Sequence, residues 1–236
     1  MAQIRIQKFF TDCGILSRRA AEAEIMAGRV KINGITAEVG QKIDADCDVV
    51  EYKGKTVKMP EKRHFTYVML NKPRGYLSTV TDDRGRNTVT ELVSDVGTRL
   101  YPVGRLDMDS EGLLLLTNDG SFSHSIISPK RHVAKVYRAA VSGVLDDRDI
   151  EAFAEGIVLS DGTKCMSAGL SIERPSVGLA TVYEGKYHQV KRMFASRGKH
   201  VTALHRLSIG GLSLDPSLRP GDFRELTEEE KKAIFE

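Results

Sequence analysis

A short polar loop that leads into an uninterrupted apolar run constrains the chain more than any other stretch. Residues 104–112 form the loop, and four leucines at 113–116 follow it directly. Because the leucines lead to the turn signal Asn-Asp-Gly at residues 118–120, they predict a strand that is buried on both faces. The loop should therefore be attached to a rigid core element, where a reactive carboxylate can be held in one geometry. The candidate acids are Asp107, Asp109 and Glu111.

Length and composition limit the chain to a few classes of protein. The 236 residues suffice for one or two domains, and a hydrophobic content of 41% is enough to build a core. No stretch approaches the roughly 20 apolar residues of a membrane span, and the first residues contain no apolar signal region. Three widely spaced cysteines fit reduced thiols better than a disulfide framework. These features predict a cytoplasmic protein with no membrane partner.

The distribution of charge is more informative than the net charge of +3. Residues 124–138 contain four Lys or Arg and no acid, and residues 185–206 contain six Lys or Arg, three histidines and no acid. One such segment is usually a solvated face, but two of them beside candidate site residues favour contact with a phosphate backbone. We therefore expect nucleic acid as the partner.

The first fifty residues have the pattern of a small separate module. Apolar residues at helical spacing within 6–13 predict a helix that ends at Gly14. Ser17 is a suitable N-cap for a second helix, which Gly28 should end. Residues 30–34 predict a strand followed by an Asn-Gly hairpin turn.

Two cations stand at the start of the second predicted helix. Arg18 and Arg19 lie where the helix dipole disfavours positive charge by about 0.3–1 kcal/mol. Exposed backbone N–H groups and two guanidinium groups would together bind a phosphate. Taken alone, the pair fits solvent-exposed arginines equally well.

The whole segment resembles the αL RNA-binding module that a small-subunit ribosomal protein, tyrosyl-tRNA synthetases and many pseudouridine synthases share. The resemblance covers about residues 2–50, with matching positions in register at 5–9, 14, 17–20, 25 and 28–34. It implies that residues 1–60 form an RNA-binding domain with its linker. The RNA contacts that it implies come from Arg5, Lys8, Arg18, Arg19 and Arg29.

The remaining chain mixes strands and helices without a regular βαβ period. Residues 52–63 predict a linker or a loosely packed hairpin, Phe65–Leu70 a strand, and residues 71–75 a turn. Val133–Val141 predicts a strand with Tyr137 on the face of its two terminal valines, and Leu179–Tyr183 predicts another strand. Helices are expected at Asp147–Gly156, with Ile150, Phe153 and Ala154 buried, and from about Val190 to Gly198. The pattern indicates an α+β fold with a largely antiparallel sheet.

The order Gly-Arg-Leu-Asp, further acids, Gly and an aliphatic run in residues 104–116 resembles the signature of the RsuA/RluB family of pseudouridine synthases. In that family the aspartate of this motif is catalytic, which implies the role for Asp107. The Leu-Asn-Lys-Pro-x-Gly element at residues 70–75 matches the start of the family's catalytic domain. The resemblance implies a catalytic domain at 61–236 with a mixed, mainly antiparallel sheet flanked by helices.

Two further segments resemble family motifs and imply partners for Asp107. Residues 183–194 resemble the family's Glu-Gly-[Arg/Lys]-x-His-Gln segment, whose later basic residue pairs with the catalytic aspartate; here it is Lys191, where many relatives have arginine. Residues 128–137 resemble the family's Lys-x-Tyr strand, so Tyr137 would support the target uracil. Without the resemblance, Lys191 would fit a solvated helix flank and Tyr137 a core tyrosine. RNA contacts are further expected from Arg105, Lys130, Arg131, Lys135, Lys186, His188 and Arg192.

The resemblance implies isomerisation of a uridine to pseudouridine without any cofactor. The histidines and cysteines show no metal-binding spacing, and there is no dinucleotide or P-loop motif. Residues 120–129 look closest to the branch that modifies small-subunit (16S) ribosomal RNA, with the large-subunit (23S) branches as the alternative. The expected partner is ribosomal RNA or an assembling ribosomal subunit, and the chain is expected to act as a monomer.

Two other classes of function stay open at this point. A non-catalytic RNA-binding or ribosome-assembly protein would have the same basic segments but would not need Asp107. A glycosidase would use Asp107 with Asp109 or Glu111, yet acids so close in one loop rarely oppose each other across a sugar at roughly 5–9.5 Å.

Overall fold

The computed structural model describes residues 3–60 and 64–236, and the chain divides into two units, Met1–His64 and Phe65–Glu236. The sequence pattern predicts this division between residues 60 and 61. Three residues of the expected linker, 61–63, lie outside the described residues. Each unit has its own hydrophobic core and is described separately.

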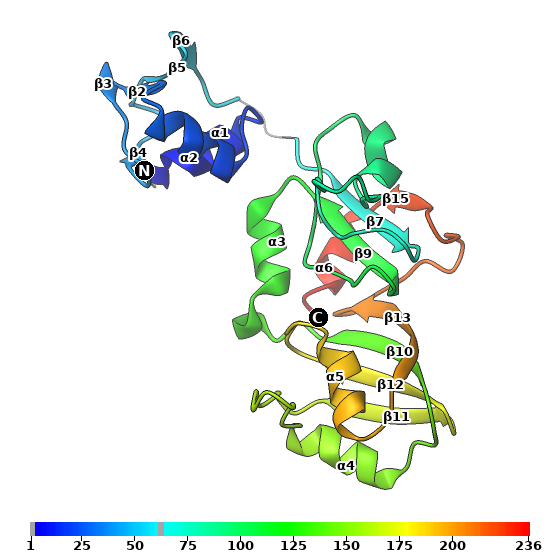
Figure 1. Cartoon of the computed structure of the whole chain (residues 1–236). Coiled ribbons are helices and arrows are strands. Elements are labelled where there is room, and N and C mark those ends of the chain that lie inside the picture. Colours follow the sequence, from blue (N-terminus) through cyan, green and yellow to red (C-terminus); the bar gives the residue numbers. More distant parts are fainter. Residues whose placement is uncertain (1–2, 61–63) are drawn as a thin grey trace. The chain divides into compact units, whose positions relative to one another are not determined.

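The N-terminal unit packs two helices against short strands (Figure 1). A two-stranded sheet pairs β1 with β4, and a four-stranded antiparallel sheet has the order β3-β2-β5-β6. The elements are β1 Ile4–Arg5, α1 Ile6–Asp12, α2 Arg18–Met26, β2 Val30–Ile32, β3 Ile35–Thr36, β4 Lys42–Ile43, β5 Val50–Tyr52 and β6 Lys55–Val57.

Local sequence signals account for the ends of these elements. The Ser17 hydroxyl accepts a hydrogen bond from the Ala20 backbone N–H and caps α2, as predicted. Asn33 and Gly34 both adopt positive φ, at 51° and 80°, which is the geometry of the tight turn expected between β2 and β3. The apolar residues of α1 are buried against Ile25 of α2. Both predicted helices and the hairpin are therefore confirmed.

The C-terminal unit is built on one large sheet with the order β11-β12-β10-β13-β9-β7-β15 (Figure 1). Within residues 64–236, β13 and β9 pair in parallel and the other pairings of this sheet are antiparallel. The strands are β7 Tyr67–Lys72, β8 Tyr101–Pro102, β9 Glu111–Thr117, β10 Lys135–Val141, β11 Gly169–Arg174, β12 Val177–Val182, β13 Val201–Ile209, β14 Leu212–Ser213 and β15 Phe223–Glu225. The predicted α+β class is confirmed.

Helices and turns contribute side chains to both faces of the sheet. One core cluster contains the Val93, Phe153 and Phe194 side chains, and the other contains Ile126 and Ile234. The helical elements are η1 Glu91–Val96, α3 Gly120–Ile127, η2 Pro129–Arg131, α4 Asp147–Glu155, α5 Gln189–Ser196 and α6 Glu228–Ala233. No helix of the described residues is long and apolar enough to cross a membrane.

The four leucines of β9 show why the opening motif is rigid. Leu114 and Leu116 lie in one core cluster and Leu113 and Leu115 in the other, and all are at most 1% exposed. Alternate strand residues face opposite sides of a sheet, so a strand covered on both sides is continuously apolar. Burial of four leucine side chains at about 1.5–3 kcal/mol each anchors the strand that carries the acidic loop.

A glycine allows β9 and β13 to meet. Gly112 has a φ of +100°, and a Cβ built on it would lie 2.3 Å from the Arg206 carbonyl oxygen and 2.8 Å from the Arg206 nitrogen. Any side chain at this position would therefore push the two strands apart. The glycine that ends the acidic loop thus brings Arg206 of β13 beside the start of β9, where Arg206 pairs with Gly112.

The structure corrects three details of the sequence analysis. Residues 71 and 72, predicted in a turn, belong to β7 because they pair with residues 113 and 112 of β9. Ala154 is exposed, because the buried side of α4 is formed by Asp149 and Phe153, one turn apart. Val133 precedes β10 and packs on the opposite side of the sheet from Tyr137, since the ladder shifts register between Val136 and Tyr137.

Candidate active site

A buried lysine holds the acidic loop in place. Lys72 is fully buried, and its ammonium donates hydrogen bonds to the backbone oxygens of Pro73 at 3.0 Å, Asp107 at 3.1 Å and Ser110 at 2.8 Å. It also contacts the Met108 oxygen at 3.5 Å, so four carbonyl oxygens surround the three donors of this ammonium group. The backbone on both sides of Asp109 is thereby tied to the end of β7.

Burial lowers the pKa of Lys72 to about 8, although the nearby carboxylates of Asp109, Asp107 and Glu111 favour its charged form. The folded state therefore binds fewer protons at this lysine than the unfolded state between pH 8 and its ordinary pKa of 10.5. The contribution of Lys72 to the free energy of unfolding is therefore lowest below pH 8 and rises as the pH approaches 10.5.

Replacing Lys72 by Met should lower the free energy of unfolding at pH 7 by about 1–3 kcal/mol, because buried carbonyls lose their donor. The deficit relative to the wild type should grow as the pH rises from 8 to 10.5, since only the wild type regains stability there. Urea unfolding at several pH values measures both effects, with the exposed Lys42→Met as control. A constant deficit across this range would show that Lys72 does not titrate with folding.

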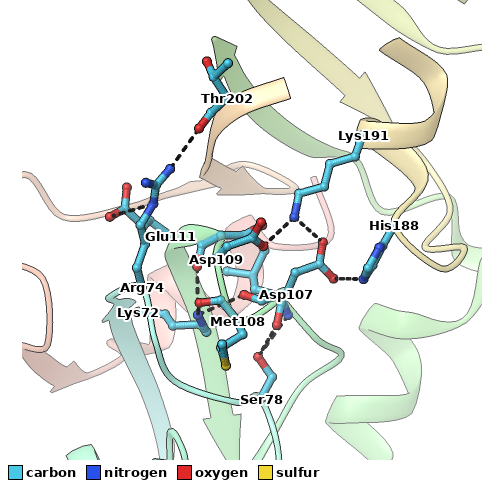
Figure 2. A network of polar contacts seen from close by, with 12 residues as sticks. Lys72, Arg74, Ser78, Asp107, Met108, Asp109, Glu111, His188, Lys191 and Thr202 are labelled. Atoms are coloured by element: carbon cyan, nitrogen blue, oxygen red, sulfur yellow. Dashed lines mark hydrogen bonds and ion pairs between the residues drawn. The ribbon is translucent and has the colours of Figure 1, made fainter. Parts of the chain in front are cut away.

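Two further contacts complete the anchoring of the loop. The Ser78 hydroxyl donates to the Leu106 carbonyl at 2.8 Å and accepts from the Leu106 backbone N–H at 3.0 Å. The Gly75 backbone N–H donates to the Met108 carbonyl at 2.7 Å. Asp107 therefore sits between residues that are each held by the segment following β7, which restricts where its carboxylate can point (Figure 2).

A braced turn positions the opposite wall of the site. Glu184 and Gln189 are buried, and the Gln189 amide donates to Glu184 at 2.9 Å while its oxygen accepts from the Lys186 backbone N–H. These hydrogen bonds fix the residues at the start of α5, where His188 adopts a positive φ of 48°. The predicted motif of residues 183–194 is therefore a rigid turn followed by a helix, and it directs His188 and Lys191 toward the acidic loop.

The two walls meet at Asp107 (Figure 2). The Lys191 ammonium lies 2.9 Å from one Asp107 carboxylate oxygen, and His188 Nε2 lies 3.2 Å from the other. Lys191 also contacts Asp109 at 2.5 Å. Asp107 is 27% exposed, whereas Asp109 is 72% exposed. The structure thus places the expected Asp107–Lys191 pair together, with Asp109 on its solvent side.

The paired charges stabilise each other's ionised forms. The hydrogen bond from Lys191 holds the pKa of Asp109 below its usual value despite partial burial. Burial acts to lower the pKa of Lys191, but its hydrogen bonds and charge interactions with Asp109 and Asp107 raise the pKa above the ordinary value. Lys191 therefore stays charged at neutral pH beside the candidate catalytic carboxylate.

Tyr137 and Arg206 lie together under the same cleft. Tyr137 is 9% exposed, and its hydroxyl accepts a hydrogen bond from Arg206 Nη1 at 3.2 Å. The cleft has a volume of about 910 Å³, and Asp107, Tyr137, His188 and Arg206 all line it. Its size suits a nucleotide-sized ligand, because small-molecule pockets hold about 300–1,000 Å³.

The residues expected to contact RNA in this unit separate into two groups. Arg105, Lys135, Lys186 and His188 line the cleft, whereas Lys130 and Arg131 are exposed on η2. Arg192 is 2.6 Å from Asp161 and does not line the cleft. His188 also contacts Asp107 directly, which the sequence analysis did not expect.

In the N-terminal unit Arg5, Arg18 and Arg19 are exposed, with the last two in the first turn of α2. Lys8 is 2.5 Å from Asp12, and Arg29 binds Glu24 through two nitrogens at 2.7 and 2.9 Å. Acids of the unit itself therefore already pair with two of the five cations expected to contact RNA.

Sequence reasoning missed Lys72 and Arg206 as site residues. Lys72 had a visible signal, because a lysine two positions after an apolar run and directly before proline occupies the end of a buried strand. Arg206 had none, since it is one of six Lys or Arg in a basic segment. Its side chain is only 2% exposed in the folded chain, where β13 pairs with β9.

Known proteins share the fold and the length of the chain. The sequence profile described as RNA pseudouridylate synthase matches residues 66–196. The ribosomal small subunit pseudouridine synthase A of Escherichia coli K12 is 41% identical, with 98% of this chain and 100% of that protein covered. The ribosomal large subunit pseudouridine synthase B of Bacillus subtilis is 39% identical, with 98% and 95% covered.

A solved structure agrees with the sequence comparisons. A crystal structure of a pseudouridylate synthase superposes with a TM-score of 0.72 at 36% identity, covering 98% of this chain and 99% of that chain. The match spans both units in sequence, and the relatives are covered almost from end to end. The chain therefore belongs to the RNA pseudouridylate synthase family of isomerases.

Proposed function

We propose that this RNA pseudouridine synthase isomerises one specific uridine of small-subunit (16S) ribosomal RNA, with Asp107 as the catalytic carboxylate. The observation that carries the assignment of Asp107 is its position in the cleft, with Lys191 at 2.9 Å and His188 at 3.2 Å on its two oxygens. An ionised carboxylate on a rigid loop beside a fixed cation can act as nucleophile or base on a bound nucleotide.

The reaction breaks the bond between the ribose and the uracil nitrogen and rejoins the base through carbon 5. The target uridine must leave the RNA helix to reach the cleft, at a cost of a few kcal/mol. Lys186 and Arg105 at the cleft would offset this cost through contacts with neighbouring phosphates. Tyr137 would lie against the uracil at the floor of the cleft.

The N-terminal unit would hold the RNA through Arg18 and Arg19, as the αL resemblance implies. Both side chains are exposed at the N-terminal end of α2, where backbone N–H groups also favour an anion. The double variant Arg18→Gln/Arg19→Gln should therefore bind RNA more weakly. Its log–log salt slope should be about 1.8 smaller, because each lost phosphate contact removes roughly 0.9 on duplex if B-DNA behaviour carries over.

Titrations of a ribosomal RNA fragment at several salt concentrations measure this slope. The control is Lys231→Gln/Lys232→Gln in α6, which removes the same charge from the other unit. Equal slopes in the two double variants would mean that α2 does not contact phosphate.

The choice of 16S over 23S RNA is supported by the 41% identical small-subunit enzyme of Escherichia coli, while the 39% identical large-subunit enzyme keeps 23S RNA as the second candidate. Mapping pseudouridine in ribosomal RNA from cells with and without this protein tests the choice directly. Loss of one 16S site supports the proposal, and loss of a 23S site replaces it.

The site geometry bears on the two other classes considered. Asp107 and Asp109 both contact the same Lys191 nitrogen, so they do not face opposite sides of a sugar as a glycosidase requires. A non-catalytic RNA-binding protein would have no need for a carboxylate paired with Lys191 on a loop whose backbone Lys72 and Ser78 hold. Conversion of uridine in an RNA transcript by the purified protein separates the catalytic from the non-catalytic role.

A further inference from the structure

One guanidinium group at the floor of the cleft is only partly used by the protein. Arg206 is 2% exposed, and its Nε donates to the Leu113 carbonyl at 2.7 Å while its Nη1 donates to the Tyr137 hydroxyl at 3.2 Å. Its Nη2 is buried without any hydrogen-bond partner. A buried charged donor that stays unpaired is costly, which calls for an acceptor that the protein alone does not supply.

The charge of Arg206 is also not neutralised. Within residues 64–236 no carboxylate forms an ion pair with it, and its fixed partners are a carbonyl and a phenol. A second cation stands nearby, because Lys135 also lines the cleft and the Arg206 charge adds to burial in lowering the Lys135 pKa to about 8. The floor of the cleft therefore favours a ligand that carries or develops negative charge.

We propose that Arg206 is a catalytic residue that donates a hydrogen bond from Nη2 to a carbonyl oxygen of the target uracil and stabilises the uracil anion released when the glycosidic bond breaks. The inference rests on the proposed function. When the bond between C1′ of the ribose and N1 of uracil breaks, the electron pair stays on uracil and spreads over N1 and the carbonyl oxygens. Fixed donors aimed at developing charge in a dry site are the strongest electrostatic catalysts.

The residues around Arg206 favour a nucleobase over a phosphate group as its ligand. The cleft beside it is lined by the apolar side chains of Val182, Leu204 and Ile209 and by the Tyr137 ring. Such walls suit a flat heterocycle, whereas a phosphate would keep water around its oxygens. Arg206 is also rigid, since Gly112 allows the close approach of β13 and Leu113 binds its Nε. Leu113 of β9 therefore fixes Arg206, and the loop that carries Asp107 leads directly into the same strand.

The proposed step balances as follows. Uracil takes the electron pair of the C1′–N1 bond, which leaves C1′ of the ribose short of electrons. Asp107 makes up this loss either by bonding to C1′ or by removing the C2′ proton. The uracil then turns, carbon 5 bonds to C1′, and Asp107 is released or returns the proton. The proton on carbon 5 is lost to a base, and N1 takes one from water, so Arg206 contributes charge and no proton.

The experiment compares uridine and 5-fluorouridine in one RNA transcript. Fluorine makes the uracil anion more stable, so breaking of the glycosidic bond depends less on stabilisation of this anion by the protein. We measure the single-turnover loss of the original nucleoside at saturating RNA, after digestion to nucleosides, for the wild type, Arg206→Gln and Arg206→Lys. The control is Arg224→Met, which breaks ion pairs with Asp215 and Glu230 in residues that do not line the cleft.

With uridine, Arg206→Gln should be slower than the wild type by about 10²–10³-fold, the usual effect of removing one such donor. With 5-fluorouridine the defect should shrink by at least about tenfold, on the same principle, and Arg206→Lys should be less impaired than Arg206→Gln because it keeps the charge. Arg224→Met should show the same relative rate on both RNAs. Circular dichroism of each variant shows whether it is folded.

Equal defects of Arg206→Gln on the two RNAs would overturn the inference and leave Arg206 a structural residue. A normal rate at saturating RNA combined with a weaker Kd would also overturn it, because Arg206 would then bind phosphate. Failure of the wild type to convert uridine at all would instead refute the proposed function.

Discussion

Replacing Asp107 by Asn should abolish isomerisation, with a loss of at least about 10⁴-fold in the single-turnover rate, the size of effect seen when other enzymes lose a covalent catalyst. The amide keeps the shape of the side chain and its place between Lys191 and His188, but it loses the negative charge. RNA affinity should stay nearly unchanged, because the phosphate contacts are made elsewhere. Formation of pseudouridine and filter binding of the same transcript give the two measurements.

Asp109→Asn is the matched control for this result. It removes a carboxylate from the same loop that contacts the same Lys191 nitrogen, yet Asp109 is 72% exposed and Lys191 keeps Asp107 as its partner. The expected loss in rate is below about tenfold, since exposed ion pairs contribute only about 0–1 kcal/mol. Equal losses in the two variants would refute the assignment of catalysis to Asp107.

Lys191→Met should also cause a large loss of activity. The change leaves the Asp107 and Asp109 carboxylates close together without the cation that both contact, so their ionised forms lose stabilisation. Activity at neutral pH should fall by about 10²-fold or more and recover partly as the pH rises, because general acid–base catalysis follows the fraction of ionised carboxylate. The single-turnover rate against pH is the measurement, and the acid limb should move upward in the variant.

Lys191→Arg provides the discriminating comparison, because the resemblance to the family motif implies that arginine can take this position. A guanidinium group keeps the positive charge and can bind one carboxylate through two nitrogens, so much of the activity should remain and the acid limb should stay in place. A Met variant with the wild-type rate and an unmoved acid limb would contradict the ion pair as part of the mechanism.

Several parts of the structure could be predicted because their signals are local. The cap at Ser17, the Asn33-Gly34 turn and the four leucines of β9 each depend on neighbouring residues, and the structure confirms them. The expected pair of Asp107 and Lys191 came from family motifs rather than from periodicity, and the structure places the two side chains 2.9 Å apart. Their catalytic roles stay predictions until the variants are measured.

Other features depend on contacts between distant segments and could not be predicted. The sequence shows an Asp107 loop before a buried strand, but not that Lys72, 35 positions away, ties the loop through its carbonyls. It shows an arginine at position 206, but not that its side chain lies under the cleft beside Tyr137.

The chain's own pattern therefore determines most elements and buried faces and places the candidate acids in one loop, whereas the family motif selects Asp107 among them. The tertiary structure alone decides which cations enter the site, because a charged side chain can be buried only where a particular carbonyl, phenol or carboxylate from another strand meets it. Periodicity in the sequence indicates which face of an element is apolar. The parallel pairing of β13 with β9 that buries Arg206 depends instead on contact between segments that are far apart in the sequence.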